Sequence, residues 1–258
     1  MRALIIAFST YSRVPMPRVN FNEKAMRYCM CFFPIVGLFI GCVEAALYYL
    51  FHEVWELSFV FAALVLTAVP ILITGGIHVD GYMDVADAKR SYKSREEQLA
   101  IMKDPHIGAF AVIDTICYFI LYIGTSYQLL VSMGDGCYAK NVVPIVYIFV
   151  IERVLSGLSV VVFPKAKSDG MLATTAKTAD KKVAAILVIM GIVFTAISAF
   201  VRPIHTAVVA TIALIFFVAY WISSKQQYGG TTGDLAGDFL QKTEYACLIA
   251  LLAVFEIL

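Results

Sequence analysis

Long apolar runs separated by short polar segments dominate this sequence. Six runs reach the length of about 20 residues that a helix needs to cross a bilayer, and a shorter seventh run ends the chain. The seven runs cover residues 30–52, 57–77, 107–131, 143–163, 182–201, 203–223 and 243–258. This pattern predicts an all-α, polytopic integral membrane bundle of about six or seven transmembrane helices, built as a single domain over residues 1–258.

The first residues form a shorter apolar stretch. Met1–Ser12 is too short to span a bilayer, and it ends at the segment Arg13–Pro17, which contains two prolines. The stretch lacks the small-residue cleavage site of a signal peptide. We therefore expect an interfacial or re-entrant N-terminal segment that stays part of the protein.

Lysine and arginine residues lie almost entirely on one side of the predicted bundle. Of the twenty, seventeen fall in segments on the side of the N-terminus and two on the other side, while Arg153 lies within a run. Because loops rich in Lys and Arg stay in the cytoplasm, we expect a multi-pass protein of the cell membrane. Its N-terminal arm and residues 75–108, 164–181 and 225–242 would then share the cytoplasmic side.

The composition agrees with a membrane protein and excludes several other classes. Hydrophobic residues make up 60% of the chain, charged residues 15%, and the mean hydropathy is +0.81. Soluble domains average about 45–50% apolar and about 25% charged residues. The net charge of +1 gives no basic footprint for nucleic acid. The six cysteines show neither zinc-site spacing nor the pattern of a disulfide framework.

The most unusual polar segment directly follows the second run. Within Gly75–Asp87, the aspartates Asp80, Asp84 and Asp87 recur at i, i+4 and i+7, which places them on one face of a helix. Three carboxylates on one stripe repel each other unless a positive charge lies between them. Mg²⁺ is commonly held by one or two carboxylates together with substrate phosphates. We therefore predict a Mg²⁺ site here, with a solvated helix face as the structural alternative.

Two further polar segments on the same side could complete such a site. Residues 95–104 are typical of a short amphipathic helix, after which Lys103 could meet a phosphate and Asp104 could join the metal. Thr232, Gly233 and Asp234 belong to a Gly/Thr loop whose N–H groups and hydroxyls suit phosphate oxygens. This loop is not a P-loop, because the lysine and the strand–loop–helix context are missing. A flexible surface turn is its structural alternative.

Three other candidates each have a plain structural alternative. His78 could act as a base or be an ordinary interfacial histidine. Arg153 lies inside the fourth run, where it could face a phosphate or carboxylate of the active site or pair with Glu152 to brace the bundle. Arg13 could contact a phosphate or anchor the N-terminal segment on the cytoplasmic side.

Taken together and in this order, five segments resemble the cobalamin-5′-phosphate synthase family, also called adenosylcobinamide-GDP ribazoletransferase. The resemblance covers nearly the whole chain, and its specific part is the pair of motifs GGxHxDGxxDxxD and MKDxxIG. The matching segments are Phe8–Pro17, Phe33–Gly41, Gly75–Asp87, Ile101–Phe110 and Gly230–Asp234. The chain departs from the family pattern at Ala88, where a glycine is common, and at Glu152–Arg153, which replaces a Gly-Arg step.

The resemblance implies a membrane-bound, Mg²⁺-dependent transferase late in cobalamin assembly. Such an enzyme joins adenosylcobinamide-GDP to α-ribazole or its 5′-phosphate, both small-molecule substrates. The ribose 3′-hydroxyl attacks the phosphate nearest the cobinamide, and GMP leaves. A metal held by carboxylates would neutralise charge on the diphosphate, and a carboxylate or a histidine would take the hydroxyl proton.

The site residues follow from the motifs and from the resemblance together. The expected Mg²⁺ ligands and their supports are Asp80, Asp84, Asp87, Asp104 and Asp234. The expected proton acceptor is one of these carboxylates or His78, and the sequence does not choose between them. The expected phosphate contacts are Arg13, Lys103, Arg153, Thr232 and Gly233.

Other functions that use similar motifs are less well matched. CDP-alcohol phosphotransferases carry DxxDGxxAR followed by GxxxDxxxD, which is absent here, and prenyltransferases carry two similar Asp-rich repeats. A cation transporter would place charges near the bilayer midplane, whereas these aspartates lie at helix ends. The bilayer is the expected surrounding, and association into a homo-oligomer stays open.

Overall fold

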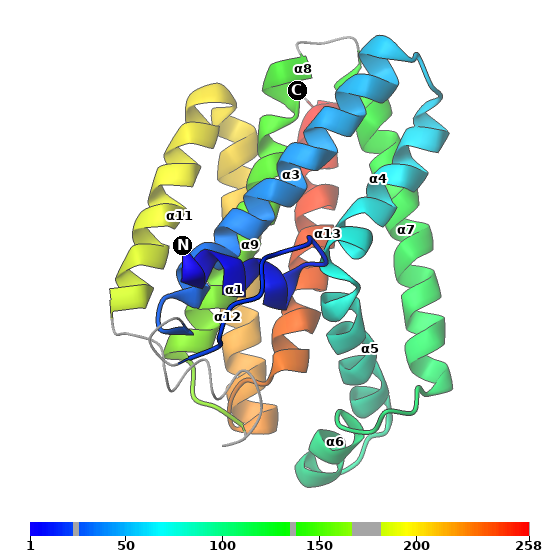
Figure 1. Cartoon of the computed structure of the whole chain (residues 1–258). Coiled ribbons are helices and arrows are strands. Elements are labelled where there is room, and N and C mark those ends of the chain that lie inside the picture. The colour runs from blue at the N-terminus through cyan, green and yellow to red at the C-terminus, as the bar shows by residue number, and fades with distance from the viewer. Residues whose placement is uncertain (23–25, 135–137, 167–181, 258) are drawn as a thin grey trace.

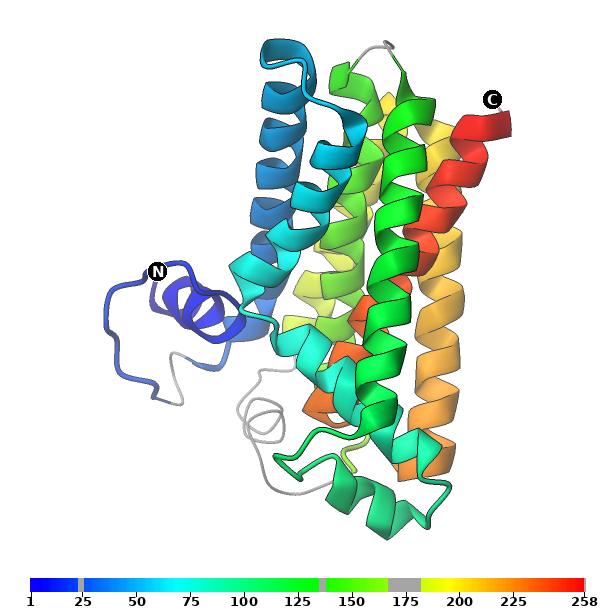
Figure 2. The same cartoon turned by 90° about the vertical axis from the view of Figure 1, so that its right-hand side faces the viewer.

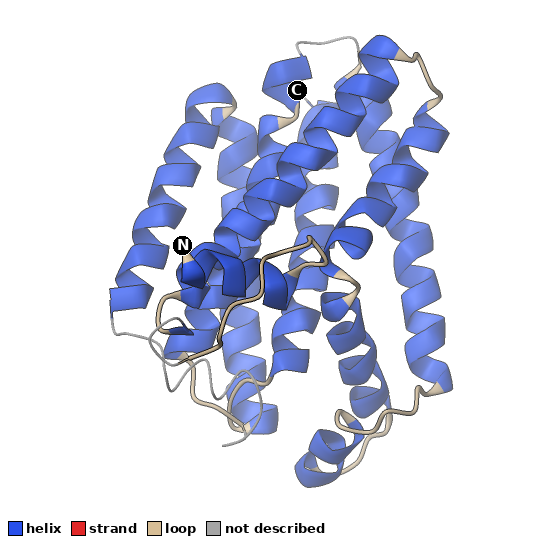
Figure 3. Cartoon of the chain, viewed as in Figure 1, coloured by secondary structure: helices blue, strands red, loops and turns tan. Residues whose placement is uncertain are grey.

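A computed structural model describes residues 1–22, 26–134, 138–166 and 182–257. Over these ranges every regular element is a helix, and the extended backbone is limited to one isolated parallel bridge between Lys165 and Thr231 (Figure 3). The predicted all-α bundle is therefore confirmed. Most of the predicted polar segment 164–181 lies outside the described residues.

The helices follow the predicted runs closely (Figure 1). In the first half these are α1 (Arg2–Tyr11), a 3₁₀ turn (Cys29–Phe32), α3 (Phe33–Tyr49), a π-helical turn (Leu50–Val54), α4 (Phe59–Thr74), α5 (Ile77–Arg90) and α6 (Arg95–Ile101). In the second half these are α7 (Ala109–Met133), α8 (Tyr138–Asn141), α9 (Val143–Val162), α11 (Lys182–Val201), α12 (Pro203–Tyr228) and α13 (Gly233–Ile257).

Five helical segments within the described part are long and apolar enough to cross a membrane. They are Cys29–Val54, Ala109–Met133, Tyr138–Val162, Lys182–Val201 and Pro203–Tyr228. A sixth span results if the bent pair of α4 and α5 is counted as one. The segment containing α9 is 72% buried, because α9 packs against α3, α11, α12 and α13.

The seventh predicted run belongs to a longer helix than expected. α13 begins at Gly233, ten residues before the run predicted at 243–258. Its first half carries polar side chains that are buried against the other helices, among them Asp238, Gln241 and Glu244. A hydropathy pattern misses this half because the polar residues face protein rather than lipid.

The N-terminal helix lies across the bundle instead of along it. α1 crosses at the level where α4 ends and α5 begins (Figures 1 and 2). Ile6, Ala7 and Phe8 are buried, and the Arg13 N–H donates a hydrogen bond to the Ile73 carbonyl at 2.7 Å. This orientation is the one expected of a helix at a membrane interface.

Two glycines separate α4 from α5. Gly75 and Gly76 have φ angles of 69° and 79°, a left-handed conformation that glycine adopts without strain, and α4 and α5 are bent by 93°. Beyond the break, α5 and α6 lie at the end of the bundle opposite the C-terminus (Figure 1). We call this the α6 end; it also holds the last turns of α9 and α12 and the first turns of α13 (Figure 1).

Candidate functional site

The three aspartates of the GGxHxDGxxDxxD motif lie on α5, as their spacing predicted. α5 is amphipathic: Val85 and Ala88 are fully buried, Asp84 and Asp87 are half-buried, and Asp80 is exposed. Because α5 starts beyond the Gly75–Gly76 break, this acidic face lies outside the long apolar helices.

Close packing of two helices brings a fourth carboxylate to this face. A Cβ atom on Gly81 would lie 2.8 Å from the Asp234 carbonyl oxygen, and one on Gly237 would lie 3.0 Å from the His78 carbonyl oxygen. Glycine at both positions lets the first turn of α13 approach the backbone of α5. Asp234, in that first turn, consequently lies beside the α5 aspartates.

The electrostatics of Asp84 show how crowded this face is. Burial, followed in order of effect by the neighbouring carboxylates of Asp80, Asp234 and Asp87, raises the pKa of Asp84 from 3.8 to about 7. No ion pair among the described residues includes Asp80 or Asp84. A bound cation would relieve this repulsion.

The nearby basic residues of α5 are bound to other acids. Lys89 lies 3.7 Å from Asp238, which also pairs with Lys242 at 2.5 Å. Arg90 donates two hydrogen bonds to the Asp114 carboxylate. α5 thus carries paired charges at Lys89 and Arg90, and Asp80 and Asp84 have no ion-pair partner in the part of the chain that the structure describes, an arrangement that the sequence did not reveal.

The donor set of this acidic face suits Mg²⁺, which prefers carboxylate oxygens and keeps part of its shell for water or substrate. Within the described ranges, no group of three His, Cys, Asp or Glu side chains is arranged to hold a metal ion. The protein would therefore supply part of the coordination, through Asp84 with Asp80 or Asp234. A substrate diphosphate would supply further oxygens.

Asp87 has a structural contact that the spacing did not reveal. Its carboxylate accepts hydrogen bonds from the backbone N–H groups of Gly108 at 2.5 Å and Ala111 at 2.9 Å. These groups belong to the first turn of α7, where N–H groups lack partners within the helix. Asp87 therefore caps α7 from a neighbouring helix, and a side chain on Gly108 would displace it.

The Gly/Thr loop is ordered by contacts on both sides. The Thr231 N–H donates to the Pro164 carbonyl at 2.8 Å, and the Thr231 and Tyr220 hydroxyls are hydrogen-bonded. The Thr232 hydroxyl accepts the Leu235 N–H at 3.2 Å and so caps α13. Gly233 is exposed, and no atom of the described residues outside its own backbone neighbourhood lies within 4 Å of where its Cβ would be. The backbone at Gly233 is therefore accessible.

Arg13 reaches the break between α4 and α5. Its side chain packs so closely on Gly75 that a Cβ atom there would lie 2.5 Å from the Arg13 Nε. The residue is exposed. The N-terminal arm thus places a guanidinium group next to the start of the helix that carries the aspartates.

Lys103 and Asp104 lie on the exposed turn between α6 and α7. The Asp104 carboxylate accepts the His106 N–H at 3.0 Å and contacts the His106 ring at 2.6 Å. These contacts lower the pKa of Asp104. Asp104 is not among the carboxylates that act on Asp84, so the structure does not group it with the acidic face.

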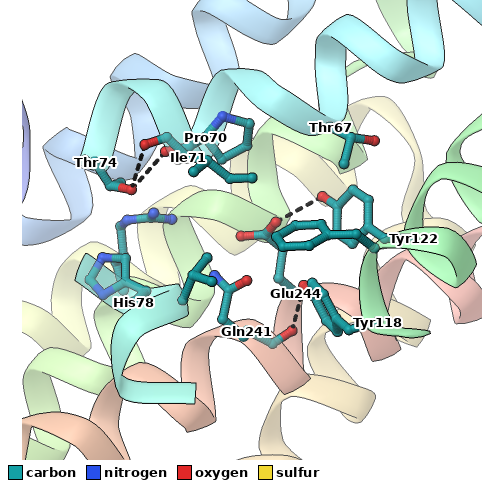
Figure 4. A pocket seen from close by; sticks show the side chains of 12 residues that line it. Thr67, Pro70, Ile71, Thr74, His78, Tyr118, Tyr122, Gln241 and Glu244 are labelled. Carbon is teal, nitrogen blue, oxygen red and sulfur yellow. Dashed lines mark hydrogen bonds between the residues drawn. The ribbon is translucent and has the colours of Figure 1, made fainter. Parts of the chain in front are cut away.

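His78, on the inner side of α5, and Arg153, on α9, both lie within the bundle. They line a cavity of about 10 Å³, together with Tyr122, Gln241 and Glu244 (Figure 4). This volume is enough for about one water molecule. His78 is 6% exposed, and its Nε2 has no hydrogen-bond partner among the described residues. Burial, with the Arg153 charge second, lowers the pKa of His78 to about 3.

Arg153 belongs to a buried polar cluster of the bundle. It is 1% exposed, pairs with Glu152, and donates to the Phe149 carbonyl at 3.1 Å. Glu244 of α13 accepts the Tyr122 hydroxyl at 2.8 Å. We call Glu44, Tyr122, Glu152, Arg153 and Glu244 the interior cluster. The pair with Glu152, which was the structural alternative for Arg153, is the arrangement observed. No pattern in the sequence indicated that Glu244 and Tyr122 lie in the same cluster.

Comparison with known proteins points to one family. The family profile described as Cobalamin-5-phosphate synthase matches residues 3–252. A protein of Lachnoclostridium phytofermentans named adenosylcobinamide-GDP ribazoletransferase is 44% identical, over 98% of this chain and 93% of its own length. Proteins of the same name from Geobacillus sp. and Clostridium botulinum are 32% and 31% identical, over 91% and 92% of this chain and 89% and 91% of their own lengths. No solved structure gives a significant match.

Proposed function

The chain belongs to the cobalamin-5-phosphate synthase family, and from this we propose that it joins adenosylcobinamide-GDP to α-ribazole or its 5′-phosphate at the acidic face of α5. The membership makes the chain a transferase of cobalamin biosynthesis and confirms the resemblance found in the sequence. The exact substrates, the Mg²⁺ requirement and the cytoplasmic position of the site are parts of the proposal.

The observation that carries the proposal is the setting of Asp84. Its carboxylate is half-buried, and its charged neighbours are Asp80, Asp234 and Asp87. A divalent cation would stabilise such a group of carboxylates by offsetting their repulsion, and a diphosphate could share the same cation. When bound, Mg²⁺ would neutralise charge on the bridging and leaving oxygens of the diphosphate.

In the proposed reaction, the 3′-hydroxyl oxygen of the ribose forms a bond to the phosphorus nearest the cobinamide. The bond between that phosphorus and the bridging oxygen of the diphosphate breaks, and GMP leaves with the oxygen. Asp84 with Asp80 or Asp234 would hold the metal, which would orient the diphosphate. Gly233 and Arg13 border the same face and are placed to contact phosphate oxygens.

We assign the hydroxyl proton to a carboxylate of the acidic face rather than to His78. A general base works best when its pKa lies near the working pH and when the substrate can reach it. The pKa of His78 is lowered to about 3 by burial inside the bundle, whereas Asp80 is exposed. By the same reasoning we assign Arg153 to bracing the bundle, because it is buried against Glu152 and Phe149.

The test uses the purified, detergent-solubilised protein with adenosylcobinamide-GDP and α-ribazole 5′-phosphate, in Mg²⁺ and in EDTA. We expect GMP and a cobalamin product in equal amounts with Mg²⁺ and neither product with EDTA. Glu96→Gln, on the exposed face of α6, is the control variant and keeps wild-type turnover. Turnover of a CDP-alcohol or a prenyl diphosphate in place of the corrinoid donor would contradict the proposal.

A further inference from the structure

A second hollow lies at the α6 end, on the other side of Pro164 from the Gly/Thr loop, whose Thr231 N–H bonds to the Pro164 carbonyl. It is a groove of about 410 Å³ between the end of α9 and the last turns of α12. The described residues that line it, all but Lys225 apolar, are Val162, Phe163, Pro164, Phe217, Val218, Trp221 and Lys225. None of these residues takes part in the proposed reaction.

The position of the groove along α12 matches the boundary of a bilayer. α12 begins at Pro203, next to Arg202, and is a membrane-spanning helix of which only 22% is buried in the bundle. At 1.5 Å per residue, Trp221 lies about 27 Å and Lys225 about 33 Å along the helix from Pro203. The hydrocarbon core of a bilayer is about 30 Å thick. The apolar part of the groove therefore faces acyl chains, and Lys225 lies at the level of the headgroups.

The walls of the groove are apolar and packed. Phe163 is 7% exposed, and its ring lies 5.1 Å from that of Phe217. Val218 and Trp221 stand in the open part of the groove, where they are 49% and 45% exposed. A substrate with a polar aromatic base would need several fixed hydrogen-bonding groups here, whereas the apolar side chains of the described lining offer one, the indole N–H of Trp221.

Among the described lining residues, Lys225 is the one that carries a charge. Its ammonium lies 6.0 Å from the centre of the Trp221 ring. A cation at headgroup level above an apolar groove complements an anionic headgroup joined to an acyl chain. One lysine near a membrane surface contributes about a fivefold preference for anionic lipid.

We propose that the groove between α9 and α12 binds an anionic phospholipid, with an acyl chain against Phe217, Val218 and Trp221 and the phosphate on Lys225. This inference does not depend on the proposed function. It assigns a lipid ligand to a surface that the catalytic site does not use.

The two tryptophans of the chain allow a direct test. The variant Trp55→Phe leaves Trp221 as the sole tryptophan and is reconstituted into phosphatidylcholine vesicles containing a minor share of lipid with brominated acyl chains. We expect brominated phosphatidylglycerol to quench Trp221 fluorescence with about fivefold higher apparent affinity than brominated phosphatidylcholine. Lys225→Gln should remove this preference, and Lys225→Glu should reverse it.

The matched control is Trp221→Phe, which leaves Trp55 as the sole tryptophan. Trp55 lies at the opposite end of the bundle, where it is 56% exposed, and we expect the two brominated lipids to quench it equally. Equal quenching of Trp221 by both lipids, or a preference that survives in Lys225→Gln, would overturn the proposal. So would loss of the preference when α-ribazole 5′-phosphate is added, because the groove would then take the substrate.

Discussion

Carboxylates occur in two contrasting settings in this molecule. In the interior cluster, Glu152 pairs with Arg153 and Glu244 accepts a hydrogen bond from Tyr122, all within the bundle. On the acidic face of α5, Asp84 is surrounded by Asp80, Asp234 and Asp87. Glu152 and Glu244 have partners within the bundle, whereas no ion pair in the described part of the chain includes Asp80 or Asp84. The first setting is typical of structure and the second of binding.

The largest effect should come from the acidic face. We expect Asp84→Asn to lower turnover about a thousandfold or more, equivalent to about 4 kcal/mol in transition-state stabilisation. The same change should leave the free energy of unfolding equal or higher, because it removes a charge that its neighbours repel. Product formation and thermal unfolding of the same preparation check both parts. Near-normal turnover of Asp84→Asn would contradict a role of Asp84 in catalysis.

A change in the interior cluster should lower stability and leave turnover nearly unchanged, the opposite of Asp84→Asn. Arg153→Met leaves the buried Glu152 without its cation, and removal of one partner of such a pair costs about 3–5 kcal/mol of stability. We expect a lower free energy of unfolding in detergent, with turnover per folded molecule little changed.

The double variant Glu152→Gln/Arg153→Met should recover much of the lost stability, because the unpaired charge is then gone. Turnover that falls as far as in Asp84→Asn, in protein that remains folded, would instead place Arg153 at the substrate.

Mg²⁺ should stabilise the protein through the acidic face alone. At ten times its dissociation constant, a ligand of the folded state adds about 1.4 kcal/mol. We expect thermal unfolding to shift upward with Mg²⁺ in the wild-type protein and in Glu96→Gln, and to stay unchanged in Asp84→Asn. An equal shift in all three proteins would mean that the ion acts elsewhere.

The same site predicts the direction of a pH effect without metal. Folding raises the pKa of Asp84 from its ordinary 3.8 to about 7, so the folded protein holds a proton that the unfolded chain releases between these values. Stability in EDTA should therefore fall as the pH rises from 3.8 to about 7, and this contribution should be missing in Asp84→Asn.

The smallest effect concerns Asp87, which shares features of both settings. Asp87→Ala removes the cap of α7 and should lower the free energy of unfolding by about 1 kcal/mol. Asp87→Asn keeps an acceptor oxygen and should lose less. If Asp87→Asn abolishes the upward shift of thermal unfolding with Mg²⁺, and the variant otherwise unfolds like the wild type, Asp87 is a metal ligand as well as a cap.

The sequence predicted features that depend on local spacing. The i, i+4, i+7 spacing placed Asp80, Asp84 and Asp87 on one helix face, and the hydropathy pattern located the spanning helices. It did not show that Asp87 caps α7, that Lys89 and Lys242 share Asp238, or that Glu244 joins Arg153 and Tyr122 inside the bundle. These contacts join residues far apart in the chain, and their partners are fixed only when the helices pack. The polar first half of α13 was missed for the same reason.

The contact of Arg13 with the α4–α5 break has a consequence for how the protein is made. The Arg13 N–H donates to the Ile73 carbonyl, and the Arg13 side chain covers Gly75. Because Arg13 precedes α4 in the chain, the N-terminal arm is synthesised before the α4–α5 break. The arm is therefore already present when the break forms. The C-terminus lies at the other end of the bundle (Figure 1). A C-terminal purification tag therefore leaves this order of assembly intact, whereas a truncation that includes Arg13 removes the contact with the break.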